Sequence, residues 1–211
     1  TGYEGEAPRL QPNAYADPIG GLNGAIAAMM AIRHRSLTGQ GRHIEVALLE
    51  STVHHAALPI MDYVMNGRIQ PRQGNQSTFM APHGCYRCKG KNRWCVIAIY
   101  SDQEWESFCK AIGSPERTEE ERFATFLGRL DNSKELDRLV EDWTSERESW
   151  EVMEILQQAG VAAGVVESAE DIAVRDRHLR ERGFLVEIDQ PEIGKCLYPG
   201  IHIGLSDTPG S

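Results

Sequence analysis

Residues 16–22, Ala-Asp-Pro-Ile-Gly-Gly-Leu, begin the first regular element of the chain and set the fold of its first third. Aspartate is favoured as a helix N-cap, and proline is favoured at the first helical position. The apolar residues that then recur at helical spacing are Ile19, Leu22, Ile26, Met29, Met30 and Ile32. This period predicts a mostly apolar helix from Asp17 to about Arg35.

Three glycines, Gly20, Gly21 and Gly24, lie in the first turns of this helix. Each lowers helix stability by about 1 kcal/mol relative to alanine. Glycine at such positions lets another backbone or a ligand come close, because it has no Cβ. We therefore expect a close approach near the start of the helix.

The residues after this helix predict a strand and a second helix. Residues 38–41 form a turn, residues 42–48 alternate as a strand, and a helix follows over about 49–65. The pair Asn66-Gly67 ends that helix. Helix, strand and helix in this order are typical of a layered α/β domain.

The rest of the chain has a different pattern. Residues 67–82 are polar, carry glycine and proline, and predict an inter-domain linker. Ser101 with Glu104, and Ser168 with Asp171, are spaced as capping boxes that open helices. The other expected elements are a hairpin at 84–88 and 93–100, amphipathic helices within 102–160, a short strand at 161–166, and paired strands at 184–188 and 194–199.

Composition and charge limit the function classes. The 211 residues are 41% hydrophobic and carry a formal net charge of -9, which argues against a nucleic-acid-binding surface rich in Lys and Arg. No apolar run is long enough to cross a bilayer, so we expect no membrane association. Five irregularly spaced cysteines favour reduced thiols in a cytoplasmic protein. A start without Met and loop-like ends favour a piece of a longer protein.

Asp17 is the residue whose local setting best suits chemistry. A carboxylate at a helix N-terminus meets unpaired backbone N–H groups and the positive end of the helix dipole. These stabilise and orient the anion, which could then act as a nucleophile toward an activated carbonyl or as a base. Capping is the commoner use of aspartate at this position, so local spacing alone favours a cap.

Cys85 and Cys88, with His83 nearby, raise the possibility of a metal or redox site. A structural zinc site needs a second ligand pair at matching spacing, and the other three cysteines do not supply one. On a strand, two residues three apart face opposite sides. We therefore interpret both thiols as structural and assign no metal site.

Several ordered motifs together carry a family resemblance. They are Ala-Asp-Pro-x-x-Gly-Leu at 16–22, Arg-x-Arg-x-x-Thr-Gly-x-Gly at 33–41, Val-x-Leu-Leu-Glu at 46–50, Gly-Asn at 74–75, Ala-Pro-His-Gly-x-Tyr-x-Cys at 81–88, Trp-x-x-Ile-Ala at 94–98, Trp-x-x-Phe-Cys at 105–109, Ala-Gly-Val at 159–161, His-Leu-x-x-Arg-Gly-Phe at 178–184 and Leu-Ser-x-Thr-Pro-Gly at 205–210. In this order they resemble the class III coenzyme-A transferases of the carnitine-CoA-transferase, bile-acid-inducible and formyl-CoA transferase type.

The resemblance implies an α/β fold class and a domain organisation. Residues 1–66 would be part of a Rossmann-like large domain, residues 67–82 a linker, and residues 83–188 a smaller α+β domain. Residues 189–211 would begin the return toward the large domain. Full-length members form homodimers of two interlocked rings, so the chain would be the central and C-terminal part of such a subunit.

The resemblance also implies the chemistry. Asp17 would be the catalytic residue that attacks the thioester of a donor acyl-CoA and passes through an aspartyl-CoA thioester. The partners would be an acyl-CoA and a small carboxylic acid, and no cofactor would be bound permanently. Most CoA-binding residues of the family lie upstream of this chain, so none is assigned here.

Three alternatives stay open. The racemase branch of the same superfamily uses the equivalent aspartate for proton exchange on 2-methylacyl-CoA, with an upstream histidine. The 211-residue piece could also be inactive on its own, because its CoA site is incomplete, and a zinc-binding module on Cys85 and Cys88 is a remote third. Within the transferases, residues 72–79 lack the run of glycines of some members, which disfavours a formyl-CoA or oxalate specificity.

Overall fold

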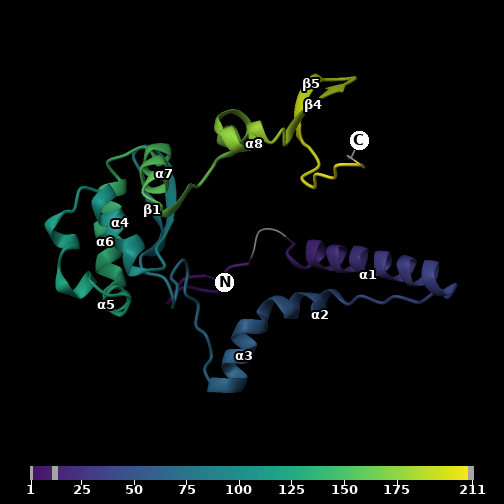
Figure 1. Ribbon diagram of the computed structural model, residues 1–211, viewed down its shortest axis with the longest axis horizontal. Helices are drawn as coiled ribbons and strands as arrows, with labels where there is room; N and C mark the ends of the chain where they lie inside the picture. Colours follow the sequence, from purple (N-terminus) through teal and green to yellow (C-terminus); the bar gives the residue numbers. More distant parts are fainter. Residues whose placement is uncertain (1, 11–13, 209–211) are drawn as a thin grey trace. The chain divides into compact units, whose positions relative to one another are not determined.

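The computed structural model describes residues 2–10 and 14–208, and the chain divides after Ser77 into two compact units (Figure 1). The first unit is helical in its described residues. Its elements are α1 (Ala16–Thr38), α2 (Leu48–Val53), the short 3₁₀ helix η1 (His54–Ala56) and α3 (Ala57–Asn66). Glycines in the left-handed conformation end α1 and α3, at Gly39 with φ 73° and at Gly67 with φ 65°.

The strand predicted over residues 42–48 is wrong. Residues 41–47 run as an irregular connection from α1 back to α2 (Figure 1). A strand needs a neighbouring strand to satisfy its backbone N–H and C=O groups. The described residues of the first unit contain no strand that could pair with this segment.

The single helix predicted over about 49–65 is also wrong in its continuity. The 3₁₀ turn at residues 54–56 interrupts it and separates α2 from α3. The apolar period is maintained on both sides of the break, which is why the sequence pattern did not reveal it. Short 3₁₀ stretches within a helix often mark a strained or functional position.

The second unit is built on the predicted hairpin, which is confirmed. Strands β1 (His83–Arg87) and β2 (Trp94–Ala98) pair antiparallel, with Tyr86 opposite Cys95. The predicted strand at 161–166 is β3 (Ala162–Val165), which pairs antiparallel with the other edge of β2. The sheet order is therefore β1-β2-β3.

Helices lie between β2 and β3 in the chain. They are α4 (Asp102–Ala111), η2 (Glu116–Thr118), η3 (Glu121–Phe123), α5 (Phe126–Asp131), α6 (Ser133–Thr144) and α7 (Ser149–Gln158). The capping box predicted at α4 is confirmed, because the Glu104 N–H donates to Ser101 Oγ at 3.1 Å. In return, the Glu104 carboxylate accepts from the Tyr100 N–H at 2.6 Å.

These elements enclose one apolar core. Its fully covered members include Cys95, Ile97, Ile99, Phe108, Leu136, Val140, Val152 and Leu156. On α4, the apolar residues Trp105 and Phe108 are buried, Cys109 is half-buried, and Ile112 just after the helix is buried. The alternation on β2 follows from strand geometry, in which successive side chains face opposite sides.

A buried arginine crosses this core. Arg129 is 0% exposed, and its guanidinium donates to the carbonyls of Ala81 and Phe123, each at 3.0 Å, and to Asp102 Oδ1 at 2.7 Å. The same group lies 5.4 Å from the centre of the Trp105 ring. A buried charge is tolerated only when its donors are satisfied, and here one side chain ties together three separate segments.

The chain continues from β3 into a short helical segment and a second hairpin. These elements are η4 (Asp171–Arg175, a π-helix), α8 (Arg177–Glu181), β4 (Leu185–Gln190) and β5 (Gly194–Pro199). The predicted pairing of the last two strands is confirmed, with Ile188 opposite Cys196. Strand β4 includes residue 188, at which the sequence analysis placed a domain boundary. The domain limits stay a prediction.

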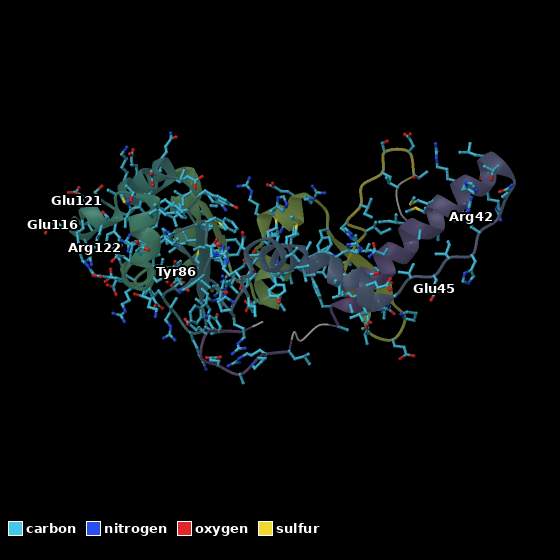
Figure 2. All side chains as sticks on the ribbon, turned by 90° about the horizontal axis from the view of Figure 1, so that it is seen from below. Arg42, Glu45, Tyr86, Glu116, Glu121 and Arg122 are labelled. Carbon is cyan, nitrogen blue, oxygen red and sulfur yellow. The ribbon has the colours of Figure 1, made fainter. Side chains whose placement is uncertain are left out.

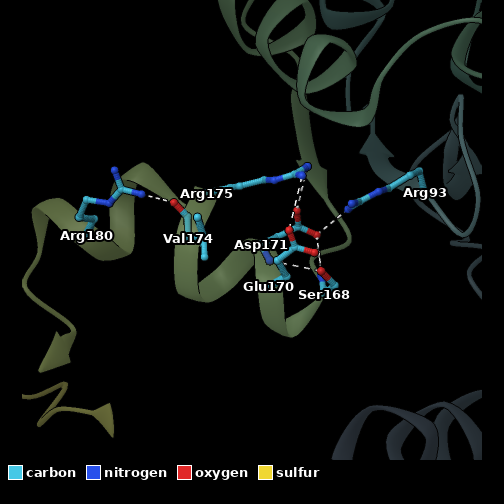
Figure 3. A network of polar contacts seen from close by, with 7 residues as sticks. All are labelled: Arg93, Ser168, Glu170, Asp171, Val174, Arg175 and Arg180. Atoms are coloured by element: carbon cyan, nitrogen blue, oxygen red, sulfur yellow. Dashed lines mark hydrogen bonds and ion pairs between the residues drawn. The ribbon is translucent and has the colours of Figure 1, made fainter. Parts of the chain in front are cut away.

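The capping box predicted at Ser168 and Asp171 is confirmed, but it opens a π-helix (Figure 3). The Asp171 carboxylate is fully buried and accepts from the Ser168 N–H at 3.0 Å and from Ser168 Oγ at 2.6 Å. Arg93, which directly precedes β2, donates to the same oxygen at 2.6 Å. Arg175 lies 3.5 Å from the other oxygen. The network fixes η4 to the three-stranded sheet.

Candidate active site

Asp17 lies in the first turn of α1, but the prediction that it caps the helix is wrong. The helix begins at Ala16, and Tyr15 holds the N-cap position without a side-chain hydrogen bond. The backbone already turns before Asp17, whose N–H donates to the Ala14 carbonyl at 3.0 Å. Asp17 therefore comes one position too late to act as the cap.

This displacement leaves the Asp17 carboxylate free. The side chain is exposed, and within residues 2–10 and 14–208 it forms no hydrogen bond or ion pair. It still lies at the positive end of a 23-residue helix, among first-turn N–H groups that have no intrahelical acceptor. A carboxylate in this setting is open to a reactant.

The start of α1 is held in place by α2. Ile19 and Gly20 are the buried residues of α1 among its described residues, and Leu48, the first residue of α2, packs on Gly20. A Cβ at Gly20 would lie 2.0 Å from Leu48 Cδ2, so only glycine fits without a shift. The close approach at Gly20 is made by the Leu48 side chain, whereas no described atom lies within 4 Å of a Cβ placed at Gly21 or Gly24.

An aromatic contact joins the same end of α1 to the 3₁₀ turn. The ring of Tyr15 meets the imidazole of His55 edge to face, with the ring centres 6.0 Å apart and the planes at 75°. Tyr15 directly precedes α1, so His55 lies at the end of the helix that carries Asp17. The local sequence pattern around His55 does not reveal this contact, because it joins residues of different elements.

A separate apolar hollow of about 530 Å³ lies along α2 and α3. It is lined by Leu49, Glu50, Val53, His54, Ala57, Ile60 and Met61. His54 lines this hollow, while its neighbour His55 contacts Tyr15, as expected for adjacent helical positions that face different sides.

Asp62 is the other notable carboxylate of the first unit, and no local sequence pattern indicates its role. Its oxygens accept from Arg68 Nε and Nη2 at 2.8 and 2.9 Å, from Asn66 at 2.8 Å and from Gln70 at 3.2 Å. The Arg68 hydrogen bonds hold the pKa of this carboxyl well below its usual range. All the accepting positions of its two oxygens are engaged. Asp62 therefore stabilises the end of α3 and is a poor nucleophile.

The loop at Gly74 and Asn75 is packed on the N-terminal segment. The Gly74 N–H donates to the Gly2 carbonyl at 3.0 Å, and Asn75 donates to the Tyr3 hydroxyl at 3.1 Å. A Cβ at Gly74 would meet the Tyr3 ring at 2.3 Å. Arg72 also donates to the Glu6 carbonyl at 2.6 Å. The start of this loop is therefore fixed within the first unit.

The remaining candidates do not form a site. Burial raises the pKa of the Cys88 thiol to about 11, so it stays protonated. The described residues contain no group of three or more His, Cys, Asp or Glu that could hold a metal ion. Arg42 and Glu45 project from the connection between α1 and α2 (Figure 2), and both are exposed. None of the described helices is both long enough and apolar enough to cross a membrane.

Comparison with known proteins gives one family and several relatives. The profile of a family described as CoA-transferase family III matches residues 1–211. The beta subunit of succinyl-CoA–L-malate CoA-transferase from Chloroflexus aurantiacus is 31% identical over 198 residues, 93% of this chain and 48% of that protein. A formyl-CoA:oxalate CoA-transferase from Bradyrhizobium sp. is 29% identical over 229 residues, 99% of this chain and 54% of that protein.

A solved structure shows the same arrangement of elements. A protein from Brucella suis described as a CAIB/BAIF family member has 28% sequence identity and a TM-score of 0.82. The match covers 99% of this chain and 53% of that one. This chain thus has the mixed α/β fold of that protein. It spans about half the length of the curated relatives it matches.

Proposed function

Because the chain belongs to CoA-transferase family III, we propose that its full-length gene product transfers CoA from an acyl-CoA to a carboxylic acid, with Asp17 as the acyl carrier. The observation that supports this role is the free carboxylate in the first turn of α1, which contrasts with the fully engaged Asp62. The relatives named as CoA-transferases support the reaction class. The acids exchanged by this protein are left open.

The proposed reaction proceeds by two exchanges at Asp17. A carboxylate oxygen of Asp17 attacks the carbonyl carbon of the donor thioester, the C–S bond breaks, and CoA leaves as a thiolate. The thiolate then attacks the aspartyl carbonyl carbon, which releases the donor acid as a carboxylate and leaves an aspartyl-CoA thioester. The acceptor carboxylate repeats these steps in reverse, so that no net proton or water is consumed.

The setting of Asp17 suits the first of these steps. The positive end of α1 lies beside the attacking carboxylate, and the Leu48–Gly20 contact fixes the turn that carries it. A fixed nucleophile reduces the entropy lost on reaching the transition state. The proposal also includes a Rossmann-like large domain, a homodimer of interlocked rings, a cytoplasmic location and no permanently bound cofactor.

Hydroxylamine trapping in the full-length gene product tests the carrier role. The protein is incubated with a panel of acyl-CoA donors, treated with hydroxylamine and mapped by peptide mass spectrometry. We expect a hydroxamate at Asp17, and turnover reduced on the order of 10³-fold or more in Asp17→Asn. Asp62→Asn is the matched control, which should keep the modification at Asp17.

The opposite results distinguish the alternatives. Deuterium exchange at the acyl α-carbon without a hydroxamate would establish the racemase chemistry instead. We further expect residues 1–211 alone to show no turnover, and clear turnover by this piece would refute the expectation of an incomplete CoA site.

A further inference from the structure

His55 is an ionisable side chain that the fold brings to the Asp17 end of α1. It reaches this place through two observed features. Leu48 seats the start of α2 on Gly20, and the 3₁₀ turn at residues 54–56 then directs the His55 ring to Tyr15. A continuous helix over about 49–65 would have altered this placement, so the break in the helix has a structural consequence at the site.

The imidazole of His55 is open to a ligand. The residue is exposed, and in the described part of the chain neither ring nitrogen has a hydrogen-bond partner. Its one ring contact, with Tyr15, fixes the ring and leaves N–H donor capacity unused. A histidine that only packed would be expected to bury its ring, as aromatic side chains do in the core of the second unit.

The proposed reaction requires a group near Asp17 that holds the acceptor carboxylate. The acceptor acid arrives as a carboxylate and must be held beside the aspartyl-CoA thioester before it can attack. An N–H donor near the site would hold the incoming carboxylate through a charge-assisted hydrogen bond. In the described residues no lysine or arginine forms an ion pair with Asp17 that could serve instead.

We infer that His55 binds the carboxylate of the acyl acceptor, and that its contact with Tyr15 holds the imidazole in position for this. The inference rests on the proposed function, because the acceptor acid is a substrate of that reaction. It adds a binding residue to the Asp17 site. His54 takes no part in it, because that side chain lines the separate apolar hollow.

Three variants of the full-length gene product separate binding from packing. His55→Phe keeps an aromatic ring against Tyr15 but has no N–H donor. His55→Gln keeps a donor but loses the ring, and His54→Phe applies the same change to the neighbouring exposed histidine. The probes are acetate, oxalate, succinate and malate, each tested as the acceptor.

We expect His55→Phe to raise the KM for the acceptor acid roughly tenfold or more, as for the loss of a hydrogen bond to a charged group, with a much smaller change in kcat. His55→Gln should recover part of this loss, and His54→Phe should match the wild type. Unchanged KM in His55→Phe, or an equal rise in His54→Phe, would overturn the inference.

Histidine-ring NMR provides a readout that does not require turnover. We expect one of the four carboxylates to shift the His55 ring signals and to leave those of His54 in place. If no hydroxamate forms at Asp17 but this shift is seen, the proposed function fails and the binding role of His55 stands. If the hydroxamate forms and the ring does not respond, the inference about His55 is wrong.

Discussion

The two units differ in where they place their apolar side chains. In the second unit, the core from Ala81 to Val161 is covered, and Phe108 at its centre is 0% exposed. In the first unit, the apolar side chains of α1 are largely open, with Leu22 and Met30 each 67% exposed. A helix that is apolar on all sides is stable only when it is covered. The unit with the candidate nucleophile thus lacks a core of its own among the described residues.

Stability and the proposed chemistry are located in different units. The second unit supplies the packed sheet and helices, while the first supplies Asp17, His55 and the contact of Gly20 with Leu48. All four tryptophans lie in the second unit, so tryptophan fluorescence during urea unfolding reports on that unit. The following changes test the difference between the units.

The largest effect is expected at the centre of the core. Phe108 stacks on Trp105 with ring centres 5.4 Å apart, so Phe108→Ala should lower the free energy of unfolding by about 3–5 kcal/mol. Leu22→Ala removes an exposed side chain and should change it by less than about 0.5 kcal/mol. Urea titration followed by tryptophan fluorescence measures the first change, and hydrogen exchange of the α1 amides measures the second. Equal losses would show that α1 is covered within this chain.

The next effect concerns the buried Arg129. Arg129→Met keeps much of the side-chain volume but leaves the carbonyls of Ala81 and Phe123 without their donor. Each unsatisfied buried carbonyl costs about 1–3 kcal/mol, so the same titration should show a loss of about 2–6 kcal/mol for the two carbonyls. Arg122→Met, at an exposed arginine on the same unit, is the control and should be nearly neutral. A neutral Arg129→Met would mean that water replaces the guanidinium.

A smaller effect with a defined pH dependence is expected at Asp171. Hydrogen bonds from the Ser168 hydroxyl and N–H, together with Arg93, lower the pKa of this carboxyl to about 2. Because the pKa is lowered on folding, the stability it contributes is present above about pH 4 and is lost as the pH falls through about 2.

Asp171→Asn should therefore lower the unfolding free energy by about 1–3 kcal/mol at neutral pH, and the difference from the wild type should shrink toward pH 2. Urea midpoints over a pH series measure this difference. A difference that stays constant with pH would indicate a steric effect of the substitution instead of the lost charge.

The smallest effect is expected at the glycines of α1. Gly21→Ala enters open space and should stabilise the helix by about 0.5–1 kcal/mol. Gly20→Ala should gain little or lose stability, because its new Cβ would force Leu48 to move. Hydrogen exchange of the α1 amides measures both. A gain at Gly20 equal to that at Gly21 would show that Leu48 yields freely.

The sequence predicted the second unit better than the first. The hairpin, the capping boxes at Ser101 and Ser168 and the buried face of α4 all follow from short-range patterns. The strand predicted over residues 42–48 failed because pairing needs a neighbour that local alternation cannot supply. Arg129 and Asp62 were missed because their partners lie in other segments or beyond a turn.

By itself, the sequence determined the family, the apolar character of α1 and the presence of an aspartate in its first turn. These are local properties, set by residue type and by spacing along one helix. Only the tertiary structure decided that Asp17 is free and not a cap, that Gly20 accommodates Leu48, and that His55 and not His54 reaches Tyr15. Each of these depends on the direction of the chain before or after a turn, which apolar periodicity does not encode.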